Sequence, residues 1–358
     1  MKKIDIYIIK QFLSTYFFAI ALIVSIAVVF DASEKIDDFI DKEAPLNAVL
    51  FDYYLNFIPY FANLFSSLFV FIAVIYFTSK MAYASEIIAI LSSGVSFFRL
   101  LYPYFIGAII ITAFNFSLGY YIIPEANKER LEFQNTYLKG KGKSGESDVH
   151  KQIEPNVYVY MENFNIRREQ GYGFSMENFD NNKLVSKLNA NRINWNQETN
   201  TWTLENYKIR RFHEDGQTIE VGSEMDTSIA VTPDDFTENE KIINAMTPRE
   251  LDKYIEQQQL RGTAAVTFSL LEKHNRIAFP FSTFILTFMG VILSSKKIRG
   301  GIGLQIGLGI LLSFTYILFM KFSDTFAISG LVSPMFAVWI PNIIYAALTF
   351  ALLPMAPK

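Results

Sequence analysis

A few charged residues stand next to long apolar runs, where a charge is costly to place. Lys321 and Asp324 follow one run at a spacing of i, i+3, and Lys273 and Arg276 precede another. An ionisable side chain within a membrane-spanning run is a functional candidate by default. The alternative is a local ion pair near the interface, with the lysine stem extended toward water. The spacing of Lys321 and Asp324 fits both interpretations.

The sequence gives no support for an intramembrane hydrolase or for a zinc or cysteine site. No apolar run holds a paired aspartate dyad, an H-E-x-x-H sequence or a serine with a plausible base. The three histidines lie far apart and give no zinc signal. Because the chain has no cysteine, disulfides and cysteine-based metal or redox sites are excluded. The sequence therefore predicts neither catalysis nor a metal or cofactor bound by this chain.

The sequence contains several long runs of uncharged, mostly apolar residues. A run of about 18 or more uncharged residues is long enough to cross the hydrocarbon core as a helix. The chain of 358 residues is 16% aromatic and has 34 Phe, which is typical of a lipid-facing protein. We predict a membrane span at each run. The runs are Gln11–Phe30, Tyr53–Ser79, Leu100–Pro124, Ile277–Ser295, Gly300–Met320 and Thr325–Pro357.

The predicted fold is an α-helical polytopic membrane protein of six transmembrane helices, arranged 3 + 3 around an inserted all-β domain of jelly-roll type. We expect residues 1–124 to hold the first three spans and a cytoplasmic helix at about 83–95. Residues 125–262 should form the inserted domain with flanking helices, and residues 263–358 the last three spans.

The distribution of lysine and arginine predicts the orientation, because these residues concentrate in short cytoplasmic loops. The short loops of one side carry only Lys35 and Lys42, among several acidic residues. The other side carries Lys2, Lys3, Lys10, Lys80, Arg99, Lys296, Lys297, Arg299 and Lys358. Both termini are therefore expected in the cytoplasm and the polar middle in the periplasm. A net charge of −3 gives no indication of nucleic-acid binding.

The polar middle shows short strand patterns separated by turn formers. Val157–Tyr160 alternates β-branched and aromatic residues, and Asn196–Asn200 is a five-residue turn segment. We expect hairpins that pair Arg192–Trp195 with Thr201–Leu204 and Tyr207–Phe212 with Thr218–Val221, then a short strand at Ser228–Val231. Lys139–Asp148 is predicted to be a loop, and a helix should begin near Thr247–Glu250 and reach Gln259.

The segment between the second and third spans predicts a short amphipathic helix. Ser85 is in position to cap it, Glu86 lies in its first turn, and Gly94 is a natural C-terminal stop. The apolar positions at i, i+3 and i+4 are Ile87, Ile90 and Leu91. One interpretation is a membrane-surface helix of no special role. The other is a coupling helix that fits a groove in a cytoplasmic ATPase, with Glu86 against a basic residue of that partner.

Motifs along the whole chain resemble those of the LptF/LptG permease family, also called the YjgP/YjgQ family. The segment Ser85–Ser96 has the family's acidic residue, hydrophobic pairs around an alanine, and a closing glycine and serine. Further matching residues are Asp5, Tyr7 and Lys10, then Asn275–Pro280, Gly290, Lys297–Gly303, Gly330–Pro334, Trp339, Pro341 and Asn342. The β-rich middle is matched in architecture and not in motif.

The resemblance implies a permease subunit of an ABC exporter that extracts lipopolysaccharide from the inner membrane. A second LptF/LptG-type permease, an LptB-type ATPase dimer and an LptC-type periplasmic bridge protein are the implied partners. ATP and Mg²⁺ would be bound by the ATPase, since this chain has no G-x-x-x-x-G-K-[ST] loop. Spans one and five of opposite subunits would form lateral gates.

The resemblance also implies site residues. Contacts to lipid phosphates are expected from Lys35, Lys321, Arg276 and Lys273. The segment around Asp31–Asp38 is more acidic than the family pattern and is either a site for accompanying divalent cations or a solvated loop. Gly303 and Gly307 form a G-x-x-x-G motif, which allows ordinary close packing or a smooth face that separates at the gate.

One alternative function stays open at this point. A mechanotransmitting or signalling membrane protein, coupled to an ATPase, would also carry a large domain outside the membrane without moving lipid through its spans. The sequence does not distinguish an F-type from a G-type half, a homodimer from a heterodimer, or one glycolipid from another.

Overall fold

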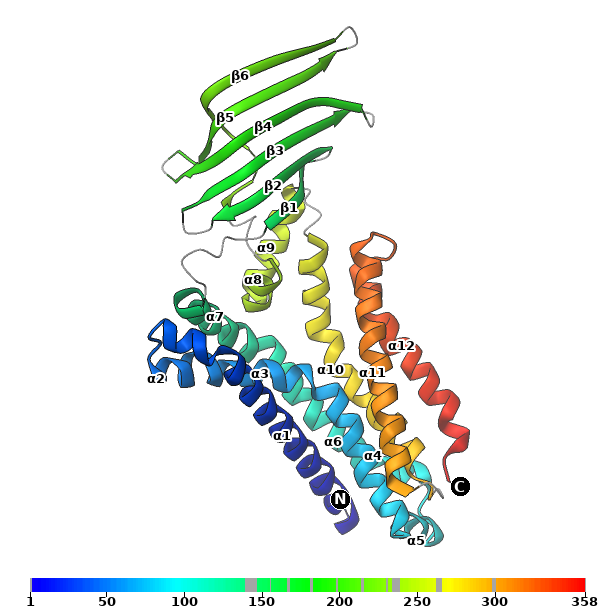
Figure 1. The fold of residues 1–358 in the computed structure, drawn as a ribbon. Helices are drawn as coiled ribbons and strands as arrows, with labels where there is room; N and C mark the ends of the chain where they lie inside the picture. Colours follow the sequence, from blue (N-terminus) through cyan, green and yellow to red (C-terminus); the bar gives the residue numbers. More distant parts are fainter. Residues whose placement is uncertain are drawn as a thin grey trace. The chain divides into compact units, whose positions relative to one another are not determined.

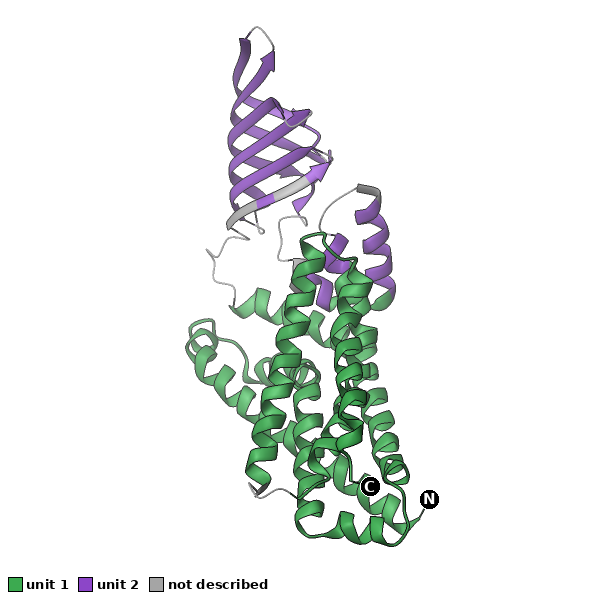
Figure 2. Cartoon of the chain, turned by 90° about the vertical axis from the view of Figure 1, so that its right-hand side faces the viewer, with its two compact units in different colours: residues 1–138, 245–248, 270–358 green, residues 139–244, 249–269 purple. Residues whose placement is uncertain are grey.

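The protein divides into two compact units, shown in Figure 2. Unit 1 comprises Met1–Leu138, Ala245–Pro248 and Leu270–Lys358, and unit 2 comprises Lys139–Asn244 and Arg249–Ser269. The computed structural model describes residues 2–138, 147–154, 156–165, 168–180, 183–197, 199–213, 216–229, 231–233, 239–261, 266–297 and 301–357. The predicted loop at Lys139–Asp148 lies largely outside these residues.

Unit 1 is built almost entirely from helices (Figure 1). Its N-terminal part contains α1 (Lys3–Asp41), α2 (Leu46–Ala48), η1 (Val49–Tyr54), α3 (Leu55–Leu64), α4 (Ser66–Tyr83), α5 (Glu86–Ser92), α6 (Phe97–Ser117), η2 (Leu118–Ile122), α7 (Ile123–Phe133) and η3 (Gln134–Leu138). Its C-terminal part contains α10 (Val266–Ser294), α11 (Gly301–Ile328), α12 (Pro334–Leu352) and η5 (Leu353–Met355), although the first residues of α10 fall in unit 2.

Six of the described helical segments are long and apolar enough to cross a membrane, which confirms the six predicted spans. Their ends differ from the apolar runs. The second candidate span begins at Ser66, because Phe65 interrupts the helix and separates α3 from α4. The fifth continues to Ile328, so the expected start of the sixth at Thr325 is wrong. Gly330 there has a φ of +76°, a left-handed conformation that ends helices.

Hydroxyl and amide groups join the membrane helices at their buried centre. Tyr16 of α1 and Asn115 of α6 both bond the Ser66 hydroxyl of α4, at 2.7 and 2.6 Å. The Tyr316 hydroxyl of α11 donates to Asn342 of α12 at 2.8 Å, and that amide donates to a carbonyl of α10. Buried polar groups need such partners because water is absent from the membrane core. These bonds fix the helices in register around the aromatic packing.

Close packing in unit 1 depends on particular glycines. A Cβ at Gly309 of α11 would lie 2.5 Å from Ile75 of α4, and one at Gly290 of α10 would also contact α4 side chains. A Cβ at Gly303 or Gly307 would meet nothing within 4 Å. The G-x-x-x-G positions are therefore open within the described chain, and both interpretations of the motif, close packing with another helix and a face that separates at a gate, stay predictions.

Replacing Gly309 by leucine should destabilise the isolated chain by about 1–3 kcal/mol, because α11 and α4 must separate to admit the side chain. The matched Gly307→Leu variant should unfold like the parent. Thermal unfolding of the detergent-solubilised protein, followed by tryptophan fluorescence, measures both. Equal melting temperatures for the two variants would contradict the packing described here.

Unit 2 contains one described antiparallel sheet in the order β1-β2-β3-β4-β5-β6. The strands are β1 (Ser147–Glu154), β2 (Val157–Asn165), β3 (Gln170–Asp180), β4 (Lys183–Asn196), β5 (Thr201–His213) and β6 (Gly216–Thr227). The predicted all-β insertion and both predicted hairpins are confirmed, with Asn196 paired to Thr201 and His213 to Gly216 at the turns. The sheet is strongly twisted (Figure 1).

One face of the sheet carries the apolar core of unit 2. Val159, Phe174, Leu188 and Leu204 come from the four successive strands β2 to β5, belong to this core and are 5% exposed or less. The predicted strand at Ser228–Val231 is wrong, because none of its described residues is in a strand. The segment covers the core instead, and the carbonyl of Val231 accepts a hydrogen bond from the buried Trp202 indole at 2.7 Å.

Two helices follow the sheet, α8 (Asn239–Ala245) and α9 (Pro248–Arg261). The predicted helix near Thr247–Glu250 is confirmed as α9, with Pro248 at its first position, where a missing N–H has no cost.

Candidate functional site

The predicted short helix between the second and third spans is present as α5, which follows α4 and precedes α6 in the chain and lies at one end of the membrane helices (Figure 1). Gly94 has a φ of +86°, and its N–H donates to the Leu91 carbonyl at 3.0 Å, so the predicted glycine stop is confirmed. The predicted serine cap is wrong. Ser85 has a φ of +62° and makes no side-chain cap bond, because an N-cap residue needs an extended backbone to reach the following N–H groups.

The apolar face of α5 packs against its own chain. Ile87 is completely buried in the core formed by α1, α4 and α6, and Ile90 and Leu91 pack against the edge of that core. The opposite face presents Glu86 and Ile88, the latter 54% exposed. The predicted face is therefore correct, but it anchors α5 to the membrane helices. A partner would meet the exposed side of α5.

An ion pair joins the start of α6, which follows α5, to the start of α1. Arg99 at the start of α6 donates to both carboxylate oxygens of Asp5 in α1, at 2.8 and 2.7 Å. The Lys2 backbone N–H also donates to Asp5, which is 1% exposed. A cavity of about 220 Å³ lies between these residues and the end of α5. The sequence marks Asp5 only as part of a motif, since 94 positions separate the partners.

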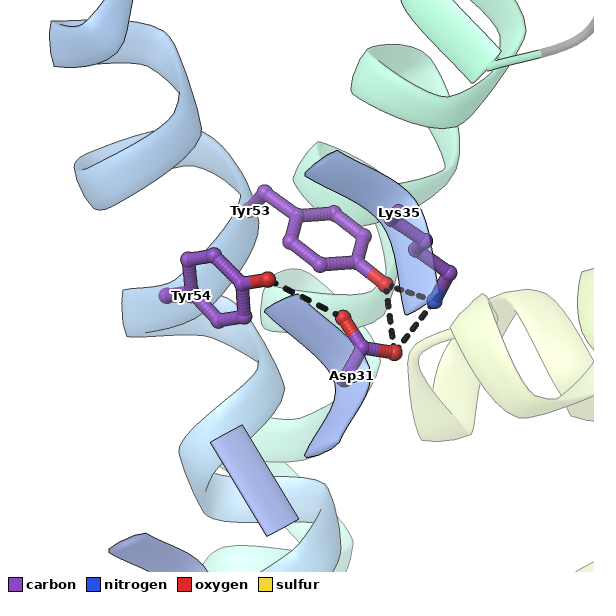
Figure 3. A network of polar contacts seen from close by, with 4 residues as sticks. All are labelled: Asp31, Lys35, Tyr53 and Tyr54. Carbon is purple, nitrogen blue, oxygen red and sulfur yellow. Dashed lines mark hydrogen bonds and ion pairs between the residues drawn. The ribbon is translucent and has the colours of Figure 1, made fainter. Parts of the chain in front are cut away.

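A second cluster of polar residues lies toward the far end of α1 (Figure 3). Lys35 pairs with Asp31 one turn before it and also bonds the Tyr53 hydroxyl of η1. Tyr53 and Tyr54 donate to the two oxygens of the same carboxylate at 3.2 and 3.3 Å. Asp31 is 13% exposed and Lys35 25%. The Lys35 ammonium group, a predicted phosphate contact, is thus already paired with the Asp31 carboxylate.

Aromatic rings surround this polar cluster and place an arginine beside it. Tyr53 packs against Phe39 of α1 and Phe133 of α7, at centroid distances of 5.8 and 5.3 Å. The Arg130 guanidinium lies 5.0 Å from the centroid of the Tyr60 ring and within electrostatic range of Asp31. Its Nε is buried without a hydrogen-bond partner. The sequence prediction missed Arg130, although a basic residue soon after an apolar run is the pattern that singled out Lys321.

The other predicted phosphate contacts are placed differently. Arg276 is 7% exposed and donates to Glu272 and to the Met246 carbonyl, both at 2.7 Å, so its guanidinium is engaged within the chain and its contact with a lipid phosphate stays a prediction. Lys273 is half-buried on the same turn of α10. Lys321 is 79% exposed and lies 3.9 Å from Asp324, so the local ion pair is present but loose.

The helices of unit 1 differ strongly in how much of their surface the chain covers. In the most apolar window of α4, 67% of residues are buried, and in that of α10, 61%. The corresponding values are 22% for α1 and 22% for α11. Large apolar side chains such as Phe18 and Phe314 project from these uncovered faces.

A comparison with protein-family models matches residues 6–355 to the family described as lipopolysaccharide export system permease LptF/LptG. A search of curated proteins finds no matching relative.

Proposed function

The chain belongs to the LptF/LptG family and is a multi-pass inner-membrane permease of lipopolysaccharide export, and we propose that it moves the lipid along the uncovered faces of α1 and α11. The proposal includes a second LptF/LptG-type permease that covers part of these faces. An LptB-type ATPase dimer supplies the energy through α5, and an LptC-type protein receives the lipid. Both termini are then cytoplasmic and unit 2 is periplasmic.

The uneven burial of the membrane helices is the observation that supports this route best. Most of the apolar window of α1 and of α11 is uncovered within the described chain, as is that of the sixth span at 28% buried, whereas α4 and α10 are mostly buried. The open Gly303 and Gly307 lie on α11, where a smooth backbone allows another helix to approach closely or to slide. These two helices are therefore suited to form a gate between subunits that lipid enters from the side.

The polar cluster at the far end of α1 supports a contact with the lipid phosphates. Arg130 has no carboxylate bound to it in the described structure, and its Nε lacks a hydrogen-bond partner. Lys35 is a second cation in the same aromatic surroundings. A guanidinium in such a partly desolvated position is well suited to bind phosphate. We assign the phosphate contact to Arg130 and Lys35, with the exposed Lys321 as a further candidate.

Site-specific photocrosslinking tests the route. A photoreactive residue in place of Phe314 of α11 or Val29 of α1 should trap lipopolysaccharide, and the yield should change with ATP when the ATPase is present. Both side chains are more than half exposed, as is Phe350 of α12, the control position that should give only an ATP-independent background. If the crosslinking yield at all three positions does not change with ATP, the mechanotransmitting alternative is favoured.

A further inference from the structure

The face of the sheet opposite the apolar core of unit 2 is hollowed into an open depression of about 1290 Å³. Its lining comes from every strand, with β2, β3, β4 and β5 contributing most. Side chains alternate between the two faces of a strand. Because Val159 of β2 and Leu188 of β4 are buried in the core, their neighbours Tyr158, Tyr160 and Asn189 project toward the depression.

The lining combines aromatic rings, amides and balanced charges. Its aromatic side chains on this face include Tyr158, Tyr160 and His150, and the rings of His150 and Tyr160 lie 4.5 Å apart. The lining amides are those of Asn189, Asn191 and Asn206. Its charged groups are Glu162, Glu177, Lys187 and Lys208, of which Glu177 and Lys187 pair at 2.6 Å. The opposite charges cancel, so this surface does not favour a strongly anionic or cationic ligand.

The asparagines of β4 are not explained by the stability of the sheet. Asn189 lies mid-strand, paired with Ser175 of β3 and Lys208 of β5, and asparagine is disfavoured at such positions. In the described part of the chain, the amides of Asn189 and Asn191 have no hydrogen-bond partner. Each amide offers both donors and an acceptor toward the depression. Their placement points to a ligand that presents many hydroxyl groups.

We propose that this depression binds the sugar rings of a glycolipid's oligosaccharide, an assignment that rests on the proposed export function for the source of the glycan. Tyr158 and Tyr160 are two positions apart on β2, about 7 Å along the strand, and offer apolar ring surface to successive sugars. The asparagine amides and the Glu177–Lys187 pair form hydrogen bonds with the hydroxyl groups of the sugars. One face of the sheet thus binds sugar, and the other face carries the apolar core.

Oligosaccharide binding to the full-length protein tests this assignment. The probe is the dephosphorylated, lipid-free oligosaccharide released from lipopolysaccharide, titrated against the protein in nanodiscs by isothermal calorimetry. Asn189→Ala and Asn191→Ala together should weaken binding at least tenfold, and each alone about threefold. Asn178 of β3 is exposed but does not line the depression, so Asn178→Ala is the matched control and should bind like the parent.

Several results would overturn the assignment. They are an absence of oligosaccharide binding by the parent protein, an equal loss in the control, and unchanged binding by the double variant. If the double variant binds sugar normally but no longer copurifies with the bridge protein, the depression is a protein interface. Photocrosslinking of sugar-free lipid A at Phe314 is measured in parallel. If lipid A does not crosslink at Phe314, the export route is refuted. If lipid A crosslinks there but the parent protein does not bind the oligosaccharide, only the sugar site is refuted.

Discussion

Exchanging Glu86 for lysine is expected to reduce the amount of ATPase that copurifies with the permease at least tenfold and to abolish lipid extraction. Glu86 is exposed at the start of α5, while the buried Ile87 beside it holds the helix against the core. A partner that docks on the exposed side of α5 would therefore reach the carboxylate. Reversing its charge replaces an attraction to a basic partner residue with a repulsion, and like charges across an interface cost several kcal/mol.

Matched variants separate this effect from general charge reversal. Glu129 of α7 is also exposed, and Glu129→Lys should leave ATPase association unchanged. Glu86→Gln keeps the size of the side chain, removes only the attraction and should give an intermediate loss. The amount of ATPase is read from purified membranes by quantitative mass spectrometry. Full association and extraction with Glu86→Lys would show that α5 is a surface helix with no coupling role.

The positions of the membrane helices were predictable from sequence because a long uncharged run has few alternatives to a membrane span. The helix ends were not, since polar residues can extend a helix beyond the membrane. The acidic segment, predicted as either a solvated loop or a divalent-cation site, is helical and continues α1 to Asp41. Likewise, Pro59 lies within the run predicted as the second span, yet the helix breaks at Phe65.

The coupling helix and the polar cluster illustrate what sequence spacing does and does not determine. The face formed by Ile87 and its apolar neighbours follows from helical periodicity within a few residues. The Arg99–Asp5 pair and the approach of Arg130 to Tyr60 join residues far apart in the chain. Only the folded arrangement of α1, α3, α6 and α7 brings them together. The capping prediction at Ser85 failed because backbone conformation, and not residue type, decides whether a hydroxyl reaches an N–H.

Replacing Asp31 by asparagine is expected to strengthen the binding of phosphorylated lipid A about tenfold, equivalent to roughly 1.4 kcal/mol. Asp31 is the carboxylate that holds Lys35, and it also accepts from Tyr53 and Tyr54. Neutralising it leaves the cations Lys35 and Arg130 without this counter-charge, and a lipid phosphate takes its place. The same change should lower the melting temperature without lipid, because a carboxylate that accepts several hydrogen bonds is lost.

Controls separate the release of Lys35 from a general change in charge. Asp37 is exposed on the same helix, so Asp37→Asn removes an identical charge and should alter binding little. Binding is measured with phosphorylated and dephosphorylated lipid A in nanodiscs, and only the phosphorylated form should respond to Asp31→Asn. In a Lys35→Ala background the tenfold increase should shrink if released Lys35 binds the phosphate, and persist if Arg130 alone does. Weaker binding by Asp31→Asn would instead mean that Asp31 orients Lys35 toward the lipid, so that the acidic residue assists the contact it was expected to oppose.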